Sequence, residues 1–349
     1  MDGEELYIDM IHEEESPKQG CSKPVTVTAS NGKQYILKNN MVKYPDEDSA
    51  TDQDAEFFQE ALVSEIATKL DVPTPNYVAI TIDSETLASF PNLRWKYQFS
   101  IGKYFATEKL PNIGNDLLSI WNLAITNNQP YAIRGWHKIL SNIINKNVIP
   151  SILCLDFYTL NFDRFTNAGN ILFQYQANGK WIVSIDYGMC FSNPYWKPIT
   201  INSNLCKKSD LLNINNPSVN PQICQSYPAN MMLWFLNASA QHGQRSKWKY
   251  GFVFDSLQRE ISFNDQNPFN DVVTNIETIS DLDLVNIIGS IPSEWVSGGN
   301  AQKEAYTGFL NRQKGLIKPF IEYNITQNMF TNYKGGQIEW HRGKNINTQ

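Results

Sequence analysis

One arrangement of apolar and polar positions occurs twice along the chain. Apolar and polar residues alternate on both sides of an Asn-Gly dipeptide in residues 25–38 (VTVTASNGKQYILK) and again in residues 171–185 (ILFQYQANGKWIVSI). Alternation with a period of two is typical of strands with one buried face, and Asn-Gly favours a tight turn in which both residues have positive φ. The sequence therefore predicts two β-hairpins, with turns at Asn31-Gly32 and Asn178-Gly179.

The first hairpin is followed by apolar residues at helical spacing. Phe58, Leu62, Ile66 and Leu70 recur at every fourth position, which predicts an amphipathic helix. The proline-containing segment DVPTP would end this helix, and Asp54 is the residue expected to cap its start.

The rest of the chain changes from strands to helices. Two strands are predicted at residues 77–83 and within 95–111, and helical spacing follows in residues 114–125, 133–144 and 148–161. Beyond a polar loop after residue 190, helices are expected to the end. The predicted order is thus hairpin, helix, two strands, helices, hairpin and helices.

Composition and charge exclude several classes of protein. The 349 residues carry a formal net charge of −6, and acidic residues gather in residues 2–15 and 46–56. There is no basic footprint for nucleic acid, and no apolar run approaches the ~18 residues of a membrane span. We therefore expect a cytoplasmic protein of one large or two coupled domains that contacts neither nucleic acid nor a membrane directly.

The cysteines and histidines form no recognisable site in the sequence. Five cysteines are scattered without a CxxC pair, and the four histidines are far apart. This distribution argues against a disulfide framework, a zinc site and a Ser-His-Asp hydrolase.

Polar residues near the ends of the predicted elements match the needs of phosphoryl transfer. That reaction needs positive charge on the phosphates, oxygen ligands for magnesium and a carboxylate that orients the acceptor hydroxyl. The candidates in chain order are Lys38, Glu60 or Glu65, Asp163, Asn170 and Asp186. Lysine, helix glutamate, aspartate, asparagine and aspartate is also the order found in protein kinases.

Each candidate has a simpler interpretation when it is taken alone. Lys38 could point into water, the helix glutamates could be ordinary helix formers, and Asp163 and Asn170 could be turn residues. Asp186 leaves the apolar run WIVSI, where a carboxylate is costly unless it is paired or binds a metal. Asp156, on the preceding helix, is expected either to hold the loop in place or to be an ordinary acid on the face of the helix.

Several segments resemble motifs of the HipA-like kinases. NFDRFTNAGNIL and WIVSIDYGMCF are similar to the catalytic and metal-binding loops of that family, and NGKQYILK to its nucleotide lysine strand. FFQEALVSEIATKLDVPTP resembles its glutamate-bearing helix, and LVNIIGSIPSEW and YTGFLNRQ resemble its Ile-Pro-x-x-Trp helix and its tail. The resemblance spans about residues 20–320, and the shared order of the motifs supports it more than any single motif does.

The resemblance implies a two-lobed α+β fold like that of protein kinases. Residues 1–105 would form a small β-rich N-lobe with one helix and the nucleotide site, and residues 106–349 a mostly helical C-lobe with the catalytic and metal-binding loops. The cofactors would be ATP and Mg²⁺, and the γ-phosphoryl group would pass to a hydroxyl, expected to be a serine or threonine of a protein substrate. A toxin-like regulator of translation, with an antitoxin or other regulatory partner, is the role that this family suggests.

The same resemblance assigns roles to individual residues. Asp163 would be the catalytic carboxylate, and Asn170 and Asp186 would be the magnesium ligands. Lys38 would contact the α- and β-phosphates, and Glu60 would hold the lysine.

Two parts of the implied nucleotide site depend on backbone contacts. The loop containing Gly20 and Ser22 would lie over the phosphates. Residues 105–110 would pair with adenine, with Ala106 and Glu108 as the expected contacts.

Two departures from the family pattern leave alternatives open. Asn170 follows Asp163 by seven residues, where about five is usual, so Asn167 competes as the metal ligand, although a subset of the family has the longer form. Phe165 stands where Asp-Arg-His loops carry a histidine. The alternatives are a nucleotide-binding pseudokinase-type interaction protein and a kinase for a small molecule or lipid.

Overall fold

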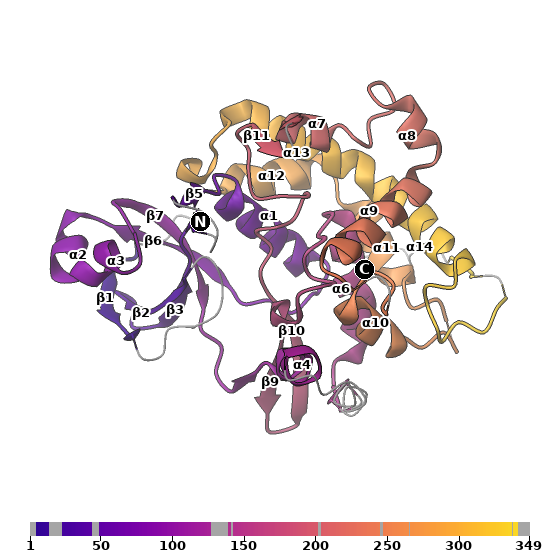
Figure 1. Cartoon of the computed structure of the whole chain (residues 1–349), viewed down its shortest axis with the longest axis horizontal. Coiled ribbons are helices and arrows are strands. Elements are labelled where there is room, and N and C mark those ends of the chain that lie inside the picture. Colours follow the sequence, from indigo (N-terminus) through magenta and orange to yellow (C-terminus); the bar gives the residue numbers. More distant parts are fainter. Residues whose placement is uncertain are drawn as a thin grey trace, which may run out of the picture.

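A five-stranded antiparallel sheet forms the smaller of two lobes, on the left of Figure 1. This computed structural model describes residues 5–13, 23–43, 49–126, 139–140, 142–201, 204–244, 247–264, 266–336 and 338–340. The strand order is β1 (Ile8–Ile11), β2 (Val25–Ala29), β3 (Gln34–Leu37), β7 (Gly102–Glu108) and β6 (Tyr77–Ile82). The sheet therefore continues past residue 105, where we expected the N-lobe to end.

The first hairpin, β2 and β3, is confirmed, but its loop differs from the expected turn. The Gly32 N–H donates to the Ala29 carbonyl at 2.8 Å, and within the loop Ser30–Gly32 only the glycine has a positive φ, 75°. This is a type I turn followed by a left-handed residue. The extra loop residue has a structural reason, because the Ser30 N–H donates to the Tyr7 carbonyl just before β1, at 2.9 Å.

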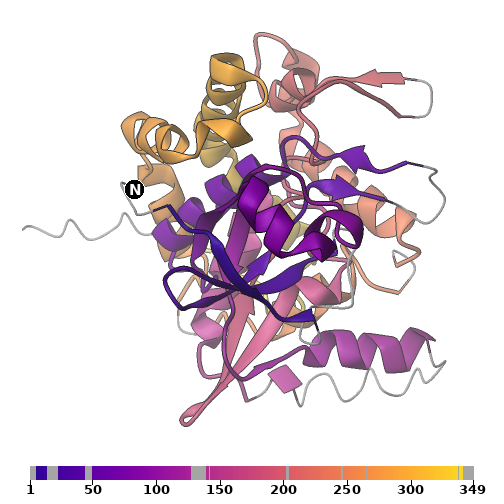
Figure 2. The same ribbon diagram turned by 90° about the vertical axis from the view of Figure 1, so that its left-hand side faces the viewer.

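The second hairpin lies at the lower edge of the molecule in Figures 1 and 2. It consists of β9 (Ile171–Gln176) and β10 (Gly179–Ser184), with β8 (Ile113–Gly114) along the outer side of β9. Gly179 pairs with Gln176, so the turn residues are Ala177 and Asn178, one position earlier than expected. Gly179 has a φ of 135°, and a Cβ there would lie 2.4 Å from the Ile144 side chain, so glycine is required where β10 begins.

Helix α1 (Glu56–Lys69) lies between the sheet and the larger lobe (Figure 1). The apolar residues expected on its inner face are buried, but Glu60 is buried as well, so the exposed face expected around it is absent. Phe57 stacks on Phe105 of β7 with ring centroids 6.3 Å apart, and Phe58 contacts Tyr306 of the larger lobe at 4.8 Å. The helix is thus covered on both sides.

Short elements that the sequence pattern did not reveal connect the longer ones. Helices α2 (Ser84–Ser89) and α3 (Pro91–Trp95) delay the strand expected near residue 95 until Gly102. Asp54 does not cap α1, because its Oδ1 accepts the Trp196 N–H at 2.8 Å. Two further strand pairs are β4 (Met41–Val42) with β5 (Thr51–Asp52) and β11 (Ile199–Ile201) with β12 (Asn204–Cys206).

Helices make up most of the larger lobe, on the right of Figure 1. Phe157 lies at its centre and packs edge to face against Phe165, Phe235 and Phe320, a geometry that aromatic rings favour. Of the three predicted helices, 133–144 lies largely outside the described residues. The helices are α4 (Asp116–Trp121), α6 (Ile149–Tyr158), α7 (Lys208–Leu212), α8 (Pro221–Gln225), α9 (Tyr227–Gln241), α10 (Phe252–Arg259), α11 (Asn270–Thr278), α12 (Asp281–Ser290), α13 (Gly299–Gln313) and α14 (Ile317–Thr326), with a π-helical turn Asn122–Thr126 and 3₁₀ turns Lys146–Val148, Ala168–Asn170, Ser293–Trp295 and Lys314–Leu316.

The Ile-Pro-x-x-Trp segment, residues 291–295, joins the two lobes. Trp295 is buried, and its indole N–H donates to the Lys103 carbonyl of β7 at 2.8 Å. The Lys103 ammonium forms an ion pair with Glu294 at 2.9 Å. Within the described ranges, no helix combines the length and the apolar character that crossing a bilayer requires.

Candidate active site

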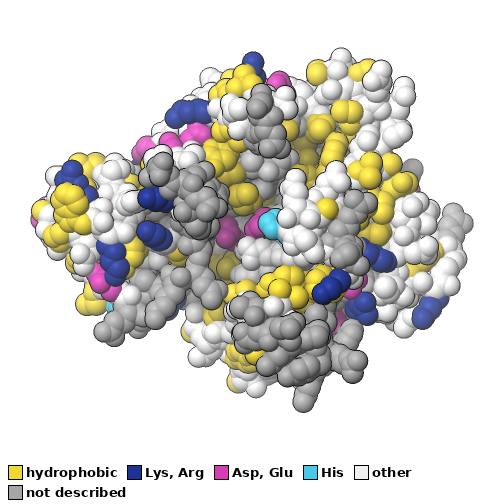
Figure 3. Space-filling view, in the orientation of Figure 1, with side chains coloured by type: hydrophobic (Ala, Val, Ile, Leu, Met, Phe, Trp, Pro, Cys, Tyr) yellow, Lys and Arg dark blue, Asp and Glu magenta, His cyan; other side chains and the backbone are white. Residues whose placement is uncertain are grey.

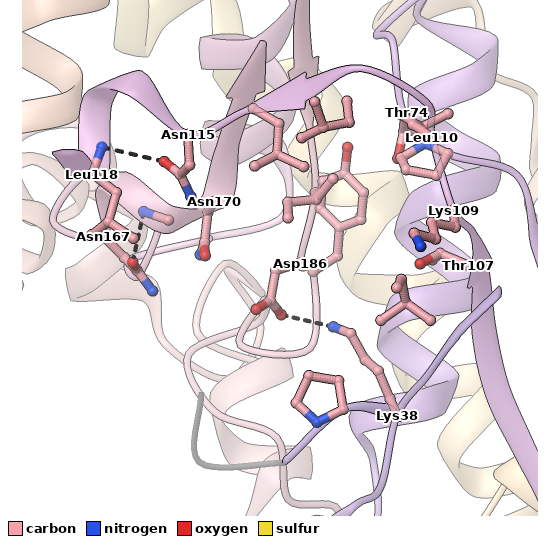
Figure 4. Close-up of a pocket in the computed structure, with 18 of the residues that line it drawn as sticks. Lys38, Thr74, Thr107, Lys109, Leu110, Asn115, Leu118, Asn167, Asn170 and Asp186 are labelled. Carbon is pink, nitrogen blue, oxygen red and sulfur yellow. Dashed lines mark hydrogen bonds and ion pairs between the residues drawn. The ribbon is translucent and has the colours of Figure 1, made fainter. Parts of the chain in front are cut away.

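A cavity of about 880 Å³ lies between the two lobes (Figure 4). The sheet contributes Ile36, Lys38 and the segment 107–110, and the larger lobe contributes Asn170 and Asp186 beside the second hairpin. Figure 3 shows acidic side chains and a histidine gathered in the hollow between the lobes. The volume falls in the range typical of small-molecule and cofactor sites.

The amino group of Lys38 lies between two carboxylates. The Lys38 N–H donates to the Phe105 carbonyl at 3.0 Å, which extends the pairing of β3 with β7 and points the side chain, like that of Ile36, into the cavity. Its Nζ donates to Glu60 and, at 3.0 Å, to Asp186 Oδ1 (Figure 4). Burial alone would lower the pKa of Lys38, but Asp186 and Glu60 raise it overall, so the amine stays charged.

Glu60, and not Glu65, is the partner of this lysine. Glu60 is 1% exposed, and its Oε1 also accepts the Gly188 N–H at 3.0 Å. Glu65 lies on another face of α1 and accepts a hydrogen bond from the Tyr77 hydroxyl at 3.0 Å. The helix therefore connects Lys38 to the loop that follows Asp186.

A second buried carboxyl group, Glu56, lies one turn before Glu60, and sequence reasoning missed it. Burial raises the pKa of Glu56 to about 8 despite the opposing charge of Lys38. Its Oε2 has no hydrogen-bond partner in the described part of the chain. A Cβ on Gly188 would lie 2.7 Å from Glu56 Cγ, so the glycine leaves the space that this side chain needs. The four-residue spacing from Glu60 is the signal that could have found it.

Asn167 and Asn170 both donate hydrogen bonds to Asp163. Their Nδ2 atoms lie 3.3 Å and 2.6 Å from the same Oδ2. The Oδ1 of Asn167 accepts the Gly169 N–H at 3.0 Å. Burial, reinforced by Asp186, raises the pKa of Asp163. Both asparagines line the 880 Å³ cavity, whereas Asp163 lines a second, smaller cavity.

Asp186 follows β10 in an uncommon backbone conformation. Its φ is 64°, in the left-handed region that non-glycine residues rarely adopt. Its side chain is 42% exposed and lines the cavity. Burial would raise the pKa of Asp186, but the ammonium of Lys38 outweighs it and lowers the pKa, so the carboxylate is charged.

Arg164 connects the loop before β9 to the end of β10, and its role was missed in the sequence. It is fully buried, and its Nη1 donates to the Asn170 and Ile185 carbonyls at 2.6 and 2.7 Å. Its Nε donates to Asp156 Oδ1 at 2.9 Å. Burial raises the pKa of Asp156 to about 6, with Arg164 opposing. Asp156 thus holds the loop through Arg164, which favours the structural role over that of an ordinary acid on the helix face.

One residue expected to contact the nucleotide does not line the cavity, and two fall on undescribed residues. Gly20 and Ser22 lie outside the described part of the chain. Ala106 is fully buried in β7, between β3 and β6, and does not line the cavity. Ala106 pairs with Leu37 of β3 and Val78 of β6 in the middle of the sheet. The lining of the cavity begins one residue later, at Thr107.

Glu108 lines the cavity, as expected, but its amide is already engaged. The Glu108 N–H donates to the Asn76 carbonyl at 2.8 Å, and the Lys109 N–H to the Gln34 carbonyl at 2.9 Å. Backbone recognition of a base by this segment would therefore use carbonyl groups or the Leu110 amide.

The oxygen donors in the cavity fit a magnesium ion that is shared with phosphates. Asn170 and Asp186 offer amide and carboxylate oxygens, the ligands that Mg²⁺ prefers. In the part of the chain that the structure describes, no cluster of three or more His, Cys, Asp or Glu could hold a metal alone. This small donor set suits an ion that completes its coordination with phosphate oxygens and water.

Comparison with known proteins agrees with this geometry. The solved structure of a proinflammatory kinase, CtkA, from Helicobacter pylori is similar over 91% of this chain and 96% of that chain, with a TM-score of 0.50 and 16% sequence identity. At this identity the likeness concerns the fold, which is the two-lobed kinase fold. No curated protein matches the chain. The model of the HipA-like kinase family matches residues 8–241. This range contains the five polar residues of the site, Lys38, Glu60, Asp163, Asn170 and Asp186. This chain therefore belongs to the HipA-like kinase family and is a phosphotransferase.

Proposed function

We propose that this kinase binds ATP with Mg²⁺ in the 880 Å³ cavity and transfers the γ-phosphoryl group to a serine or threonine hydroxyl of a protein. The observation that carries the proposal is the contact of Lys38 with both Glu60 and Asp186. Asn170 connects the same cavity to Asp163. Charge for the phosphates, oxygens for a metal and a carboxylate for the acceptor are thus present together.

On the phosphate side, Lys38 would contact the α- and β-phosphates. Two carboxylates keep its amino group charged, and its side chain points into the cavity. Asn170 and Asp186 would hold Mg²⁺, which supplies neutralisation of phosphate charge when it is bound. We favour Asn170 over Asn167, because the Asn167 Oδ1 already accepts the Gly169 N–H. The Asn170 Nδ2 donates to Asp163, so the amide oxygen of Asn170 points away from that carboxylate.

The base would lie against the apolar part of the cavity. Leu110 and Ile113 line it from the segment after β7, and Leu172 and Ile185 from the second hairpin. Burial of a planar base against such side chains is favourable at about 25 cal/mol per Å² of apolar surface.

Asp163 would act on the acceptor. Its raised pKa makes it a better proton acceptor than an exposed aspartate. The acceptor O–H gives its proton to Asp163 while its oxygen bonds to the γ-phosphorus, and the bond from that phosphorus to the β–γ bridging oxygen breaks, leaving ADP. A toxin-like role in regulating translation, with an antitoxin or other regulatory partner, rests on family membership alone and is part of the proposal only in that sense.

Transfer of label from γ-labelled ATP with Mg²⁺ tests the proposal. Wild type should label itself or an added protein on serine or threonine, and Asp163→Ala and Asp186→Ala should reduce the label by at least about 100-fold. Asp9→Ala is the control, because Asp9 is exposed on β1. Equal labelling by all four proteins would refute the assignment. ATP-dependent thermal stabilisation of wild type without any transfer would favour a nucleotide-binding pseudokinase.

A further inference from the structure

A second cavity of about 410 Å³ adjoins the catalytic loop on the side of α9. We call it the acceptor cavity and define it by Leu160, Phe162, Asp163, Met189, Trp234 and Asn237, which all line it. Asp163 belongs to this cavity, whereas Lys38, Asn170 and Asp186 belong to the 880 Å³ cavity. The catalytic carboxylate therefore stands between the two spaces.

The two oxygens of Asp163 are used differently. Oδ2 accepts the side-chain amides of Asn170 and Asn167, which face the phosphate side. Within the described part of the chain, no hydrogen bond to Oδ1 is seen, although the side chain is partly buried against the acceptor cavity. An acceptor hydroxyl in the acceptor cavity can therefore donate to Oδ1 while Oδ2 stays fixed to the metal side.

The lining of the acceptor cavity selects against charged substrates. Apart from Asp163, no described residue that lines it is Asp, Glu, Lys or Arg. Recognition of a phosphate or carboxylate group ordinarily uses Arg or Lys. Among the described lining residues His242 alone could carry a positive charge, so a phosphorylated metabolite or an anionic lipid headgroup would find neither Arg nor Lys, and the chemistry favours a neutral acceptor.

Apolar side chains from four segments form most of the wall, one of them being α7 and the residues after it, with Leu211 and Ile214. Leu160 and Phe162 come from the catalytic loop, Met189 from the loop after Asp186, and Trp234 from α9. Met189 is 36% exposed, and methionine adapts its shape to varied apolar partners. Tryptophan in a partly enclosed pocket is a frequent anchor of peptide binding. The space exceeds what a serine or threonine side chain alone would fill.

Two side-chain amides of the acceptor cavity lie along α9, and Ser192 and His242 are further polar residues of its lining. Trp234, Asn237 and Gln241 share one helix face at three- and four-residue spacing, and each lines the cavity. Side-chain amides both donate and accept hydrogen bonds, which suits the peptide groups of an extended chain. An apolar pocket beside two side-chain amides therefore matches a polypeptide.

We propose that the acceptor cavity binds a polypeptide segment in which the acceptor serine or threonine is next to an apolar residue, with Trp234 as the anchor for that residue. This inference rests on the proposed protein kinase activity, and it names the substrate class of that activity. The acceptor hydroxyl faces Asp163 Oδ1, and the neighbouring apolar side chain lies between Trp234 and Met189.

Two peptide libraries test the inference, one with a fixed serine and one with a fixed threonine, each with degenerate flanking positions. With full-length kinase, labelled ATP and Mg²⁺, label should concentrate on peptides with Leu, Ile, Met or Phe beside the acceptor. Label spread evenly over all flanks, or concentrated on peptides with charged flanks, would overturn the inference. Label that goes only to neutral small hydroxyl compounds such as glycerol, or only to lipid vesicles, would overturn it as well.

Variants of α9 then test the anchor. Trp234→Ala should raise KM for the preferred peptide by about tenfold or more, while KM for ATP changes by less than about twofold. Leu233→Ala is the matched control, because Leu233 is the preceding residue of α9 but is 49% exposed and does not line the cavity. Unchanged peptide KM in a folded Trp234→Ala protein would contradict the assignment.

A change of specificity covers the case in which Trp234→Ala does not fold. Asn237 is exposed on α9, and Asn237→Lys should shift the preferred flank from apolar to acidic. An unchanged preference in Asn237→Lys would overturn the inference.

ADP release and ATP-dependent thermal stabilisation without peptide report on the nucleotide site separately. Peptides that stay unlabelled while ATP is bound and hydrolysed would therefore overturn only the acceptor assignment. Absence of ATP binding would overturn the proposed function itself.

Discussion

The guanidinium of Arg164 and the carboxylate of Asp156 form an ion pair at 2.9 Å in which both side chains are fully buried. The Arg164 Nη2 and the Asp156 Oδ2 have no further hydrogen-bond partner in the described part of the chain. Because charges cannot be left unpaired in such surroundings, each residue depends on the other. The pair holds the catalytic loop against the loop that carries Asp186.

Breaking this pair should strongly destabilise the protein. Arg164→Met leaves Asp156 buried without its partner, so the free energy of unfolding should fall by about 3–5 kcal/mol. Arg259→Ala is the control, because its partner Asp255 lies 3.1 Å away but Arg259 is 41% exposed, and the loss should stay within about 1 kcal/mol. Urea unfolding measures both changes. Equal losses in the free energy of unfolding would show that the buried pair stabilises the protein no more than the exposed pair does.

Removing the charge of Glu60 should impair phosphoryl transfer without changing the shape of α1. Glu60→Gln keeps the size of the side chain but no longer holds Lys38 by charge, so kcat/KM for ATP should fall about 10- to 100-fold. Glu65→Gln on the same helix should change it by less than about twofold, because Glu65 contacts Tyr77 instead. Steady-state kinetics with varied ATP compares the two. Similar losses in both variants would assign the effect to the helix and not to the lysine contact.

The two asparagines should differ in their effect on the magnesium requirement. Asn170→Ala removes a proposed ligand and should raise the Mg²⁺ concentration for half-maximal activity by about tenfold or more. Asn167→Ala should raise it less, because the Asn167 Oδ1 is occupied by the Gly169 N–H. Activity measured over a Mg²⁺ titration at saturating ATP decides between them, and the reverse order would assign the metal to Asn167.

A buried lysine should make the stability of the protein depend on pH. Lys208 is 2% exposed, and its Nζ donates to the Phe191 and Asn193 carbonyls. Burial lowers the pKa of Lys208 to about 7, whereas in the unfolded chain it is about 10.4. The folded protein thus binds fewer protons than the unfolded one between these values, so stability should rise with pH across that window.

Substitution isolates this contribution. Lys208→Met should flatten the rise in the free energy of unfolding between about pH 7 and 10. Lys207→Met, at the exposed neighbouring position, should keep the wild-type slope. Urea unfolding at several pH values measures it, and a wild-type slope in Lys208→Met would show that another group causes the rise.

The positions of two polar residues at strand ends could be predicted from the sequence. Lys38 and Asp186 each follow a strand whose alternation is clear in the sequence, and the structure brings them into contact. Their positions depend on local patterns, because one buried face sets the direction of every second side chain. The two hairpins were predictable for the same reason.

What the sequence did not reveal depends on contacts between distant segments. The guanidinium of Arg164 reaches the Ile185 carbonyl across the second hairpin, and no local pattern predicts such a contact. Glu56 is buried because both lobes cover α1, and helical periodicity alone does not predict this burial. The cavity lining begins at Thr107 and not at Ala106. This position depends on how β7 is aligned with β3 and β6, which the periodicity of the sequence does not fix.

Helix α1 is enclosed from two directions, and this limits how the kinase can be switched. Many protein kinases are turned off by moving the corresponding helix, which separates the lysine from its glutamate. Here the Gln59 side chain donates to the Asn193 carbonyl at 2.9 Å and to the Tyr306 hydroxyl at 3.1 Å, and Phe57 and Phe58 are buried on either side. An outward swing would expose both rings and break these bonds together. Switching off the kinase by moving α1 would therefore have to break these contacts between the lobes as well as the contact of Lys38 with Glu60.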